Sequence, residues 1–382
     1  MEKKYISSDE LSKHNKKGDL WISIQGKVYN VSDWGQHHPG GEVVLLNLAG
    51  QDVTDAFIAY HPGTAWKHLD NFFTGFYLDD FKVSEVSKDY RRLVSEFVKL
   101  GLFEKKEHVT LFTLTSVAIM FSIVVYGVVG CDSVWAHLGS GMLLGLLWMQ
   151  STYVGHDSGH YEVMSSRGYN KLAQIICGNC LTAYPGFRGL LALVWLNLYL
   201  QTFLLLFSPT RNVPDRLYNI MGIAVFWTWF PLLLSCLPSW PERLMFVLAC
   251  FVVCSIQHLQ FCLNHFAANV YVGPPSGNDW FEKQTSGTLD ISCSTWMDWF
   301  FGGLQFQLEH HLFPRLPRAQ LRKVSPLVID LCKKHNLPYR SLTFVEANLW
   351  TLKTLRTAAL QARDFTNAAP QNLLWEAFNT HG

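Results

Sequence analysis

Residues 133–160 read SVWAHLGSGMLLGLLWMQSTYVGHDSGH, and this stretch decides how the rest of the chain is interpreted. The part from Ser133 to Val154 carries no Asp, Glu, Lys or Arg, and it has roughly the ~20-residue length of a helix that crosses a bilayer. His156 and His160 follow it directly. A spacing of four residues places both imidazoles on one face of a helix, as a metal ion requires. The stretch therefore predicts a membrane helix that ends in a candidate metal site.

Uncharged windows of similar length occur elsewhere in the chain, at Val109–Val129, Gly189–Ser208, Leu217–Leu237 and Leu244–Leu263. The loop at 130–132 and the loop at 238–243 are too short to hold domains, so each flanking pair of windows should form a hairpin. If the N-terminus is cytosolic, both hairpins return the chain to the cytosol, provided that window 189–208 lies in the membrane interface. We therefore expect an all-α multi-pass membrane domain with four transmembrane helices plus one interfacial helix.

Charge is distributed unevenly along the 382 residues. Charged side chains make up 16% of the chain, against about 25% in ordinary soluble proteins. Residues 1–108 hold 30 of the 61 charges, whereas residues 109–278 hold 11. The net charge of +1 gives no reason to expect a nucleic-acid partner. We predict four parts, which are a soluble module at 1–80, a connector at 81–108, a membrane domain at 109–365 and a tail of unknown role at 366–382.

The front module is predicted to be a small α+β domain. Ser7 and Ser8 mark a helix start, and the apolar runs Leu20–Ile24 and Val28–Val31 predict two strands joined by a turn. Helical patterns follow at 42–49 and 54–60. The N-terminus begins with Met1-Glu2-Lys3-Lys4 and lacks the apolar run of a signal peptide, so we expect this module to be cytosolic.

Two histidine motifs lie in the front module. The sequence His38-Pro39-Gly40-Gly41 is followed 23 residues after its histidine by His61-Pro62-Gly63. Together with the strand pattern around Trp21 and the segment Asp52–Phe57, these motifs resemble cytochrome b5. The resemblance implies a haem b whose iron is held from opposite faces by His38 and His61. With both axial positions filled, such a haem carries electrons and does not bind oxygen.

Further histidines lie near the C-terminal end of the membrane region. Gln307-x-x-His310-His311 precedes Leu312-Phe313-Pro314, and His265 lies seven residues after His258, on the same helix face. Imidazole is a suitable ligand for iron. Together with His156 and His160 and the haem motifs, this pattern resembles the front-end desaturases, which are cytochrome b5-fused membrane enzymes. Within that group it is most similar to the plant Δ8 sphingolipid (long-chain base) desaturases, and Gln307 at the start of the last box is a signature of the group.

The resemblance implies a complete reaction system. It assigns a non-haem di-iron centre to the ligands His156, His160, His265, His310 and His311, with Gln307 as a neighbour of the site. Electrons would come from NADH through NADH-cytochrome b5 reductase and the fused haem. The activity would be O2-dependent insertion of a double bond into the long-chain base of sphingolipids, with ceramide or a free long-chain base as substrate. The enzyme would be a multi-pass protein of the endoplasmic reticulum membrane, with its haem domain and histidine boxes in the cytosol.

One family motif is missing. The middle box, of the form H-x-x-H-H, has no counterpart, because no histidine occurs between His160 and His258. The break falls near 181–196, where the similarity to the family lapses, and an internal loss of several dozen residues explains it. A di-iron centre that lacks three imidazoles should not assemble. Three functions therefore stay open. The chain could be a Δ8 desaturase, either active or inactivated by the missing box; a Δ6 acyl-lipid desaturase; or a membrane-tethered haem protein that only transfers electrons.

Charges in the C-terminal part are expected to lie on a solvated face or, as a less favoured alternative, against anionic lipid headgroups. These residues are Arg315, Arg318, Arg322 and Lys323.

Overall fold

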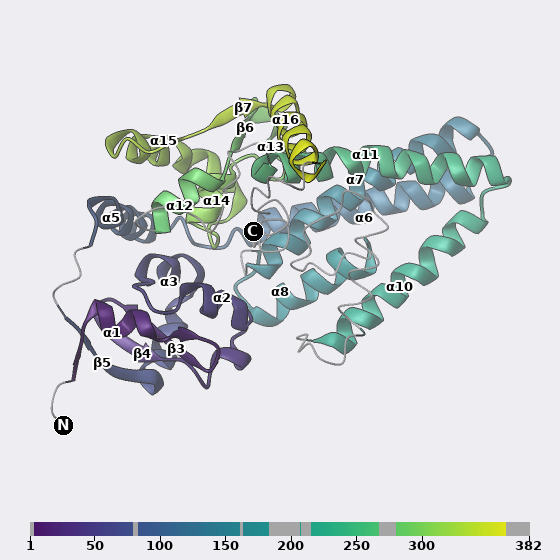
Figure 1. The fold of residues 1–382 in the computed structure, drawn as a ribbon. Coiled ribbons are helices and arrows are strands. Elements are labelled where there is room, and N and C mark those ends of the chain that lie inside the picture. Colours follow the sequence, from purple (N-terminus) through teal and green to yellow (C-terminus); the bar gives the residue numbers. More distant parts are fainter. Residues whose placement is uncertain are drawn as a thin grey trace. The chain divides into compact units, whose positions relative to one another are not determined.

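A computed structural model describes residues 4–78, 83–160, 163–182, 207, 215–266 and 280–363. Its contacts divide the chain into two compact units, which are described separately here (Figure 1). The first unit contains the described residues up to Leu100, together with 280–284 and Leu312–Pro314. The second unit contains the remaining described residues.

The first unit is built around a five-stranded sheet in the order β1-β5-β4-β3-β2. The pair β1–β5 is parallel, and the other pairs are antiparallel. The strands are β1 Tyr5–Ile6, β2 Asn15–Lys16, β3 Asp19–Ile24, β4 Lys27–Asn30 and β5 Phe73–Tyr77. The α-helices are α1 Ser8–Lys13, α2 Glu42–Leu48, α3 Thr54–Tyr60, α4 Trp66–Leu69 and α5 Glu85–Lys99, and the 3₁₀ turns are η1 Gly35–His37, η2 Gly63–Ala65 and η3 Asp70–Phe72.

Five of these elements, α1, β3, β4, α2 and α3, match the ones that the sequence predicts between residues 5 and 80. The hydroxyl of Ser7 caps α1 by accepting a hydrogen bond from the Glu10 amide. Gln25 and Gly26 both have positive φ, which gives β3 and β4 the tight turn that suits a twisted hairpin. The buried side chains of Leu20, Ile22 and Ile24 then face α2 and α3 in one apolar core.

The second unit is mainly helical, with one small parallel sheet formed by β6 Asp290–Ser292 and β7 Ser341–Thr343. Its long helices are α6 Glu107–Val129, α7 Val134–Gly159, α10 Arg216–Ser235, α11 Trp240–Phe266, α15 Arg318–Lys334 and α16 Phe344–Arg363. Shorter elements are α8 Arg167–Gln174, the π-helix η4 Ile175–Cys180, α12 Trp280–Gly287 (whose first residues belong to the first unit), η5 Thr295–Met297, α13 Asp298–Phe301 and α14 Gln307–Leu312.

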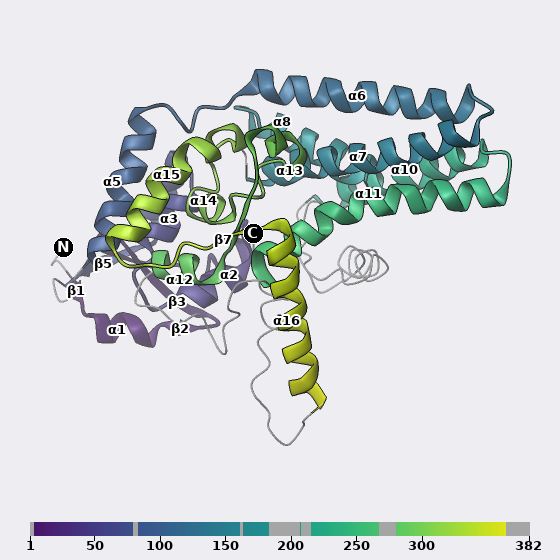
Figure 2. The same ribbon diagram turned by 90° about the horizontal axis from the view of Figure 1, so that it is seen from above.

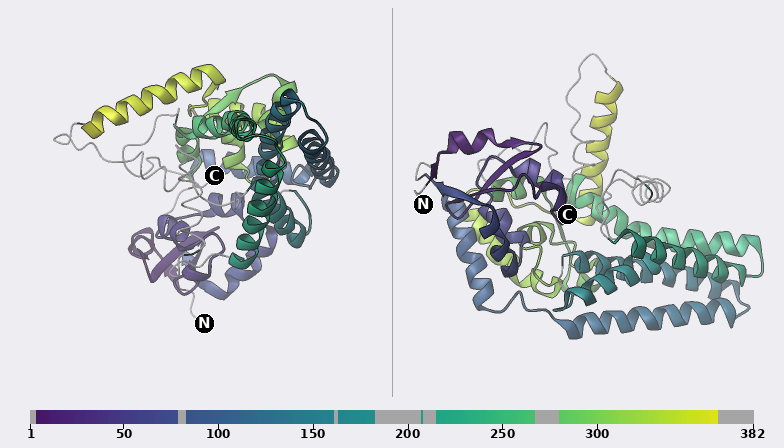
Figure 3. Two further views of the ribbon diagram at one scale, coloured as in Figure 1. Left: turned by 90° about the vertical axis from the view of Figure 1, so that its right-hand side faces the viewer. Right: turned by 90° about the horizontal axis from the view of Figure 1, so that it is seen from below.

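Helices α6, α7 and α11 pack side by side in this unit (Figures 2 and 3). Two glycines of α7 allow the close approach of α11. A Cβ added at Gly141 would lie 2.7 Å from the Phe246 carbonyl oxygen, and one added at Gly145 would lie 2.5 Å from that of Cys250. Small residues commonly let helices approach closely in membrane proteins. The packing places the C-terminal end of α7, with His156, at a defined position on a rigid scaffold.

Two helices in the described part of the chain, α6 and α10, are long and apolar enough to cross a membrane. Helices α7 and α11 coincide in position with two further predicted windows, but neither is among these candidates. Helix α7 includes His137, Gln150 and several glycines and serines, which lower its mean hydropathy. Of window 189–208, the structure describes only Phe207. The predicted count of four crossings is therefore not confirmed.

Candidate functional site

The two histidines of the front module lie close together in the first unit, with their ring planes tilted by 46°. His61 caps the C-terminus of α3, and its amide donates to the Phe57 carbonyl at 3.0 Å. His38 lies in the loop between η1 and α2, where Gly41 adopts a φ of 89° that favours glycine. The centroids of the two imidazoles are 5.9 Å apart. That separation leaves room for one metal ion between the rings at the usual imidazole–metal distance of about 2 Å.

Backbone hydrogen bonds orient both rings. Nδ1 of His38 donates to the Gly41 carbonyl at 3.2 Å, and Nδ1 of His61 donates to the Phe57 carbonyl at 3.3 Å. With Nδ1 engaged in this way, each ring is left to use Nε2 as its ligand atom. The ring of Phe57 also stacks on His61 at 4.3 Å. These two residues therefore fit the bis-imidazole ligation of a haem.

Three histidines converge in the second unit. His156 lies in the last turn of α7, His160 ends that helix, and His310 lies on α14. Each pair of rings has its centroids 4.9 Å apart. One nitrogen from each ring lies within 4.8 Å of the other two. An ion bound by three imidazoles at about 2.1 Å requires nitrogens no more than about 4.2 Å apart, so a small contraction of the cluster would hold one metal ion.

His160 is in the protonation state that metal binding requires. Burial, reinforced by the neighbouring His156, lowers the pKa of His160 to about 3. Its ring is therefore neutral at physiological pH, and only a neutral imidazole nitrogen can bind a metal.

The remaining predicted ligands are placed differently. Nε2 of His311 lies 2.9 Å from the amide nitrogen of Gln307, and its ring is 6.3 Å from that of His310. Gln307 accepts a hydrogen bond from Asn264 at 3.0 Å, which links α14 to α11. The side chain of His265 lies outside the described residues. His311 and Gln307 thus border the three-histidine cluster without joining it.

Asp157 and Arg318 support the cluster, and the sequence did not single them out for this role. Asp157 accepts a hydrogen bond from Nδ1 of His156 at 3.0 Å and forms an ion pair with Nε of Arg318 at 2.6 Å. Burial alone would raise the pKa of Asp157, but the Arg318 guanidinium and His156 outweigh it and hold that pKa below its usual value. A carboxylate bound to Nδ1 turns Nε2 of the histidine towards a metal.

The prediction that the C-terminal arginines lie on a solvated face is wrong for Arg318, whose side chain is 22% exposed beside a buried carboxylate, whereas Arg322 keeps 35% of its side chain exposed. Arg318 pairs with Asp157, and Arg322 pairs with Asp298 at 2.5 Å. The physical reason is that Asp157 lies on another helix, far from Arg318 in the sequence, so the helical periodicity around Arg318 does not reveal the pair. The one local signal was Asp157 itself, which lies between the two histidines of its box.

A buried acidic pair holds α14 against the small sheet. Asp290 of β6 accepts a hydrogen bond from the Leu308 amide at 2.9 Å. Its other oxygen lies 2.7 Å from the hydroxyl of Tyr339, which is also 3.0 Å from Glu309. Burial and the charge of Glu309 raise the pKa of Asp290 well above its usual value. Asp290 and Tyr339 therefore anchor the helix that carries His310, through the Leu308 amide and the Glu309 carboxylate.

Two family models match the chain. Residues 7–78 match the cytochrome b5-like heme/steroid binding domain, and residues 183–343 match the fatty acid desaturase model. In structural comparison, a cytochrome b5 of Ostreococcus tauri virus 2 covers 19% of this chain and 96% of its own, at 30% identity and a TM-score of 0.19.

Full-length relatives are similar along the whole chain. The "Delta(8)-fatty-acid desaturase" of Borago officinalis and the "Delta(8)-fatty-acid desaturase 2" of Arabidopsis thaliana are each 58% identical, over all of this chain and 99% of their own length. The "Acyl-lipid (9-3)-desaturase" of Borago officinalis is 50% identical over the same shares. The alignment with the first of these spans 444 positions, whereas this chain has 382 residues, so at least 62 of those positions have no counterpart here.

Proposed function

The chain belongs to the cytochrome b5-fused front-end fatty acid desaturases, and from this premise we propose that it inserts the Δ8 double bond into the long-chain base of sphingolipids. The observation that carries the proposal is the 58% identity over the full chain to relatives named Delta(8)-fatty-acid desaturases. The acyl-lipid (9-3)-desaturase is less similar, at 50%. The Δ6-type activity on acyl lipids is therefore the less favoured of the two regiochemistries.

In this proposal the first unit holds haem b between His38 and His61. Their Nδ1 atoms are engaged by backbone carbonyls, so the two Nε2 atoms would hold the haem iron. NADH-cytochrome b5 reductase is the proposed electron donor. A haem held by these two histidines would supply electron transfer.

His156, His160 and His310 would hold the non-haem metal. Iron bound there supplies the activation of O2 that removes two hydrogens from a methylene pair. The residues of this chain contribute orientation and charge. Asp157 fixes the tautomer of His156, and the Arg318 guanidinium keeps that carboxylate ionised. His160 stays neutral at physiological pH because it is buried.

The metal centre of the desaturase family contains two irons. The described residues of this chain could hold one metal ion, between His156, His160 and His310. Three imidazoles suffice for one ion, and in the part of the chain that the structure describes no second group of three or more His, Cys, Asp or Glu side chains converges. His265 remains a proposed further ligand. The shortfall agrees with the absence of an H-x-x-H-H box and with the 62 alignment positions that this chain lacks.

That shortfall favours a second candidate function, in which the chain is a membrane-tethered haem protein that carries electrons without desaturating lipid. The two candidates differ in iron content. A complete desaturase contains three irons per chain, counting the haem, whereas the electron carrier contains one.

The proposed cellular location of the chain rests on its membership of the desaturase family. Helices α6 and α10 are long and apolar enough to cross a membrane. We place the chain in the endoplasmic reticulum membrane as a multi-pass protein, with four crossings and with the haem domain and histidine boxes on the cytosolic side.

Expression in yeast tests the proposal. Long-chain bases and acyl lipids are profiled by mass spectrometry in cells that produce the parent chain or the His156→Ala variant. A Δ8-unsaturated base that appears with the parent and disappears with His156→Ala supports the desaturase. A Δ6 acyl product supports the acyl-lipid alternative. No new double bond, together with one iron per purified chain, overturns the desaturase in favour of the electron carrier.

A further inference from the structure

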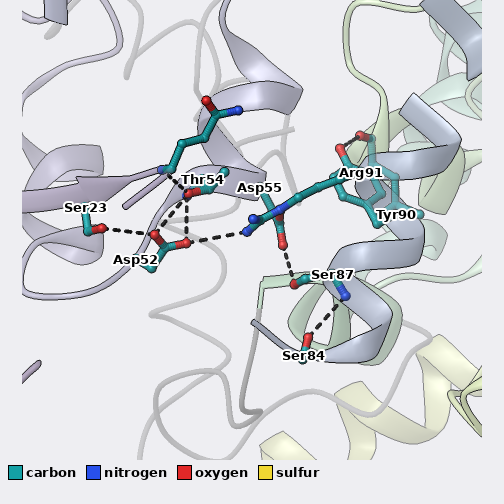
Figure 4. A network of polar contacts seen from close by, with 10 residues as sticks. Ser23, Asp52, Thr54, Asp55, Ser84, Ser87, Tyr90 and Arg91 are labelled. Carbon is teal, nitrogen blue, oxygen red and sulfur yellow. Dashed lines mark hydrogen bonds and ion pairs between the residues drawn. The ribbon is translucent and has the colours of Figure 1, made fainter. Parts of the chain in front are cut away.

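The connector helix α5 is fixed to the haem-binding part of the first unit by a buried polar network (Figure 4). Asp55 of α3 is 5% exposed, and its carboxylate binds Nε of Arg91 and the hydroxyl of Ser87, each at 2.5 Å. Arg91 also lies 3.6 Å from Asp52. A buried, bidentately satisfied carboxylate of this kind is costly to separate from its partners. The network therefore holds α5 in a defined position beside α3, the helix that leads into His61.

An aromatic contact series starts at the haem-ligand helix. Tyr60 is the residue before His61, and its ring packs edge-on against Trp280 with centroids 6.4 Å apart. Trp280 in turn packs against Tyr90 of α5 at 5.5 Å. All three residues belong to the first unit, so these contacts lie inside one compact body.

The series ends at the last histidine box. The hydroxyl of Tyr90, a fully buried residue, donates to the Leu312 carbonyl at 2.7 Å. Leu312 follows His311 in the chain. Phe313 packs against both Tyr90, at 5.6 Å, and Phe97, at 4.9 Å, and so holds this segment on α5. At one end of the series, Tyr60 is linked by a peptide bond to the proposed haem ligand His61. At the other end, Tyr90 hydrogen-bonds to Leu312, the residue that follows the last histidine box.

Aromatic clusters are commonly nothing more than core packing. Two features separate this series from the rest of the core. Its two ends coincide with the residues next to the two metal-binding motifs, and each step between them is a direct ring contact or a hydrogen bond. Electrons tunnel more readily through bonded and packed atoms than across water, and positioning such routes is the protein's contribution to cofactor chemistry.

We propose that Tyr60, Trp280 and Tyr90 form the route by which electrons pass from the haem at His61 to the last histidine box, which ends one residue before Leu312. The inference rests on the proposed function, because it requires haem between His38 and His61 and iron at the three-histidine cluster. In each transfer one electron leaves ferrous haem, which becomes ferric, and reduces a ferric ion at the cluster to ferrous. No bond forms or breaks, and the three side chains act as positioning residues.

Anaerobic flash photolysis of the purified full chain tests the route. Photoreduced deazaflavin reduces the haem within microseconds, and haem absorbance then reports its reoxidation. The measurement is made on metal-free chain and on chain loaded with Fe(III), and only the iron-dependent rate is compared. The haem potential and Soret band of each variant confirm that the haem site itself is unchanged.

Variants separate the route from general packing. In Trp280→Leu the iron-dependent rate is expected to fall by about tenfold or more. Tyr90→Phe keeps the ring contact but removes the hydrogen bond to Leu312, so a smaller decrease is expected. Trp21→Leu is the matched control, because Trp21 lies in the same unit but stacks on His14, away from the series. Its rate should stay within about twofold of the parent.

Two results would overturn the route. If Trp280→Leu transfers electrons as fast as the parent, another path operates. If the parent binds Fe(III) in equilibrium dialysis yet shows no iron-dependent reoxidation, electrons do not reach the cluster and the route alone fails. If the parent binds no iron beyond the haem, the proposed metal site fails together with the route.

Discussion

Replacing Arg318 by methionine should weaken metal binding at the three-histidine cluster without touching any histidine. Arg318 pairs with Asp157 at 2.6 Å, and Asp157 binds Nδ1 of His156. Removing the guanidinium leaves a carboxylate, 8% exposed, without its cation. Its pKa then rises because the guanidinium no longer offsets the effect of burial, and a carboxyl group with a raised pKa holds His156 less firmly. The orientation of Nε2 towards the metal is thereby loosened.

The size of the effect follows from the position of Arg318 outside the ligand set. Loss of a residue that orients a metal ligand typically costs about 10–100-fold in affinity, or ~1.4–2.8 kcal/mol. A fully buried ion pair would cost about 3–5 kcal/mol when broken. The Arg318 side chain is 22% exposed, so water compensates Asp157 for part of the lost ion pair. We therefore expect the smaller of these two free-energy costs, the one given for metal affinity.

Equilibrium dialysis against Co(II) measures this affinity, because elemental analysis separates cobalt from haem iron. Arg322→Met is the matched control. Arg322 lies one turn further along α15 and pairs with Asp298 instead of a residue of the cluster. We expect Arg318→Met to bind Co(II) about 10–100-fold more weakly than Arg322→Met. Equal affinities in the two variants would refute the reasoning that Asp157 and Arg318 orient His156.

Three further outcomes are expected. His61→Ala should abolish the b-type haem absorbance while Co(II) dialysis still detects the three-histidine cluster, and loss of both would contradict independent sites. Gly145→Ala should overpack α7 against α11, cost about 1–3 kcal/mol of stability and lower the thermal unfolding temperature in detergent. Gly139→Ala is the control and should leave that temperature unchanged, because a Cβ added there has no atom within 4 Å. Tyr339→Phe leaves the buried acidic pair without its hydroxyl donor and should destabilise the protein by about 1–3 kcal/mol, as followed by hydrogen exchange of α14. The surface variant Tyr169→Phe is its control, and a similar loss in both would rule out this account.

Local patterns predicted much of the first unit. Two short apolar runs joined by a turn indicated β3 and β4, and hydroxyl residues before an acidic turn indicated the start of α1. The spacing of His156 and His160 was also sufficient to place both on one helix face. These signals depend on residues within a few positions of one another, so the sequence displays them directly.

Membrane crossing was predicted less completely. Windows without charged residues gave four crossings, but hydropathy over the described helices supports only α6 and α10. The difference arises because α7 is buried between α6 and α11 and carries glycine and polar residues at its packed positions. An uncharged window records the absence of charge, whereas a crossing helix also needs a strongly apolar surface.

The sequence by itself indicated the kind of chemistry, through motifs around His38 and His61 and two histidine boxes that resemble those of the cytochrome b5-fused desaturases. Tertiary structure alone decided which of these residues meet. It placed His310 beside His156 and His160, and it paired Arg318 with Asp157. Those partners lie more than a hundred residues apart in the sequence. The periodicity of apolar and polar residues shows only which residues share a face of one helix or strand. Contacts between distant elements arise from packing of the whole unit, and a local pattern does not encode them.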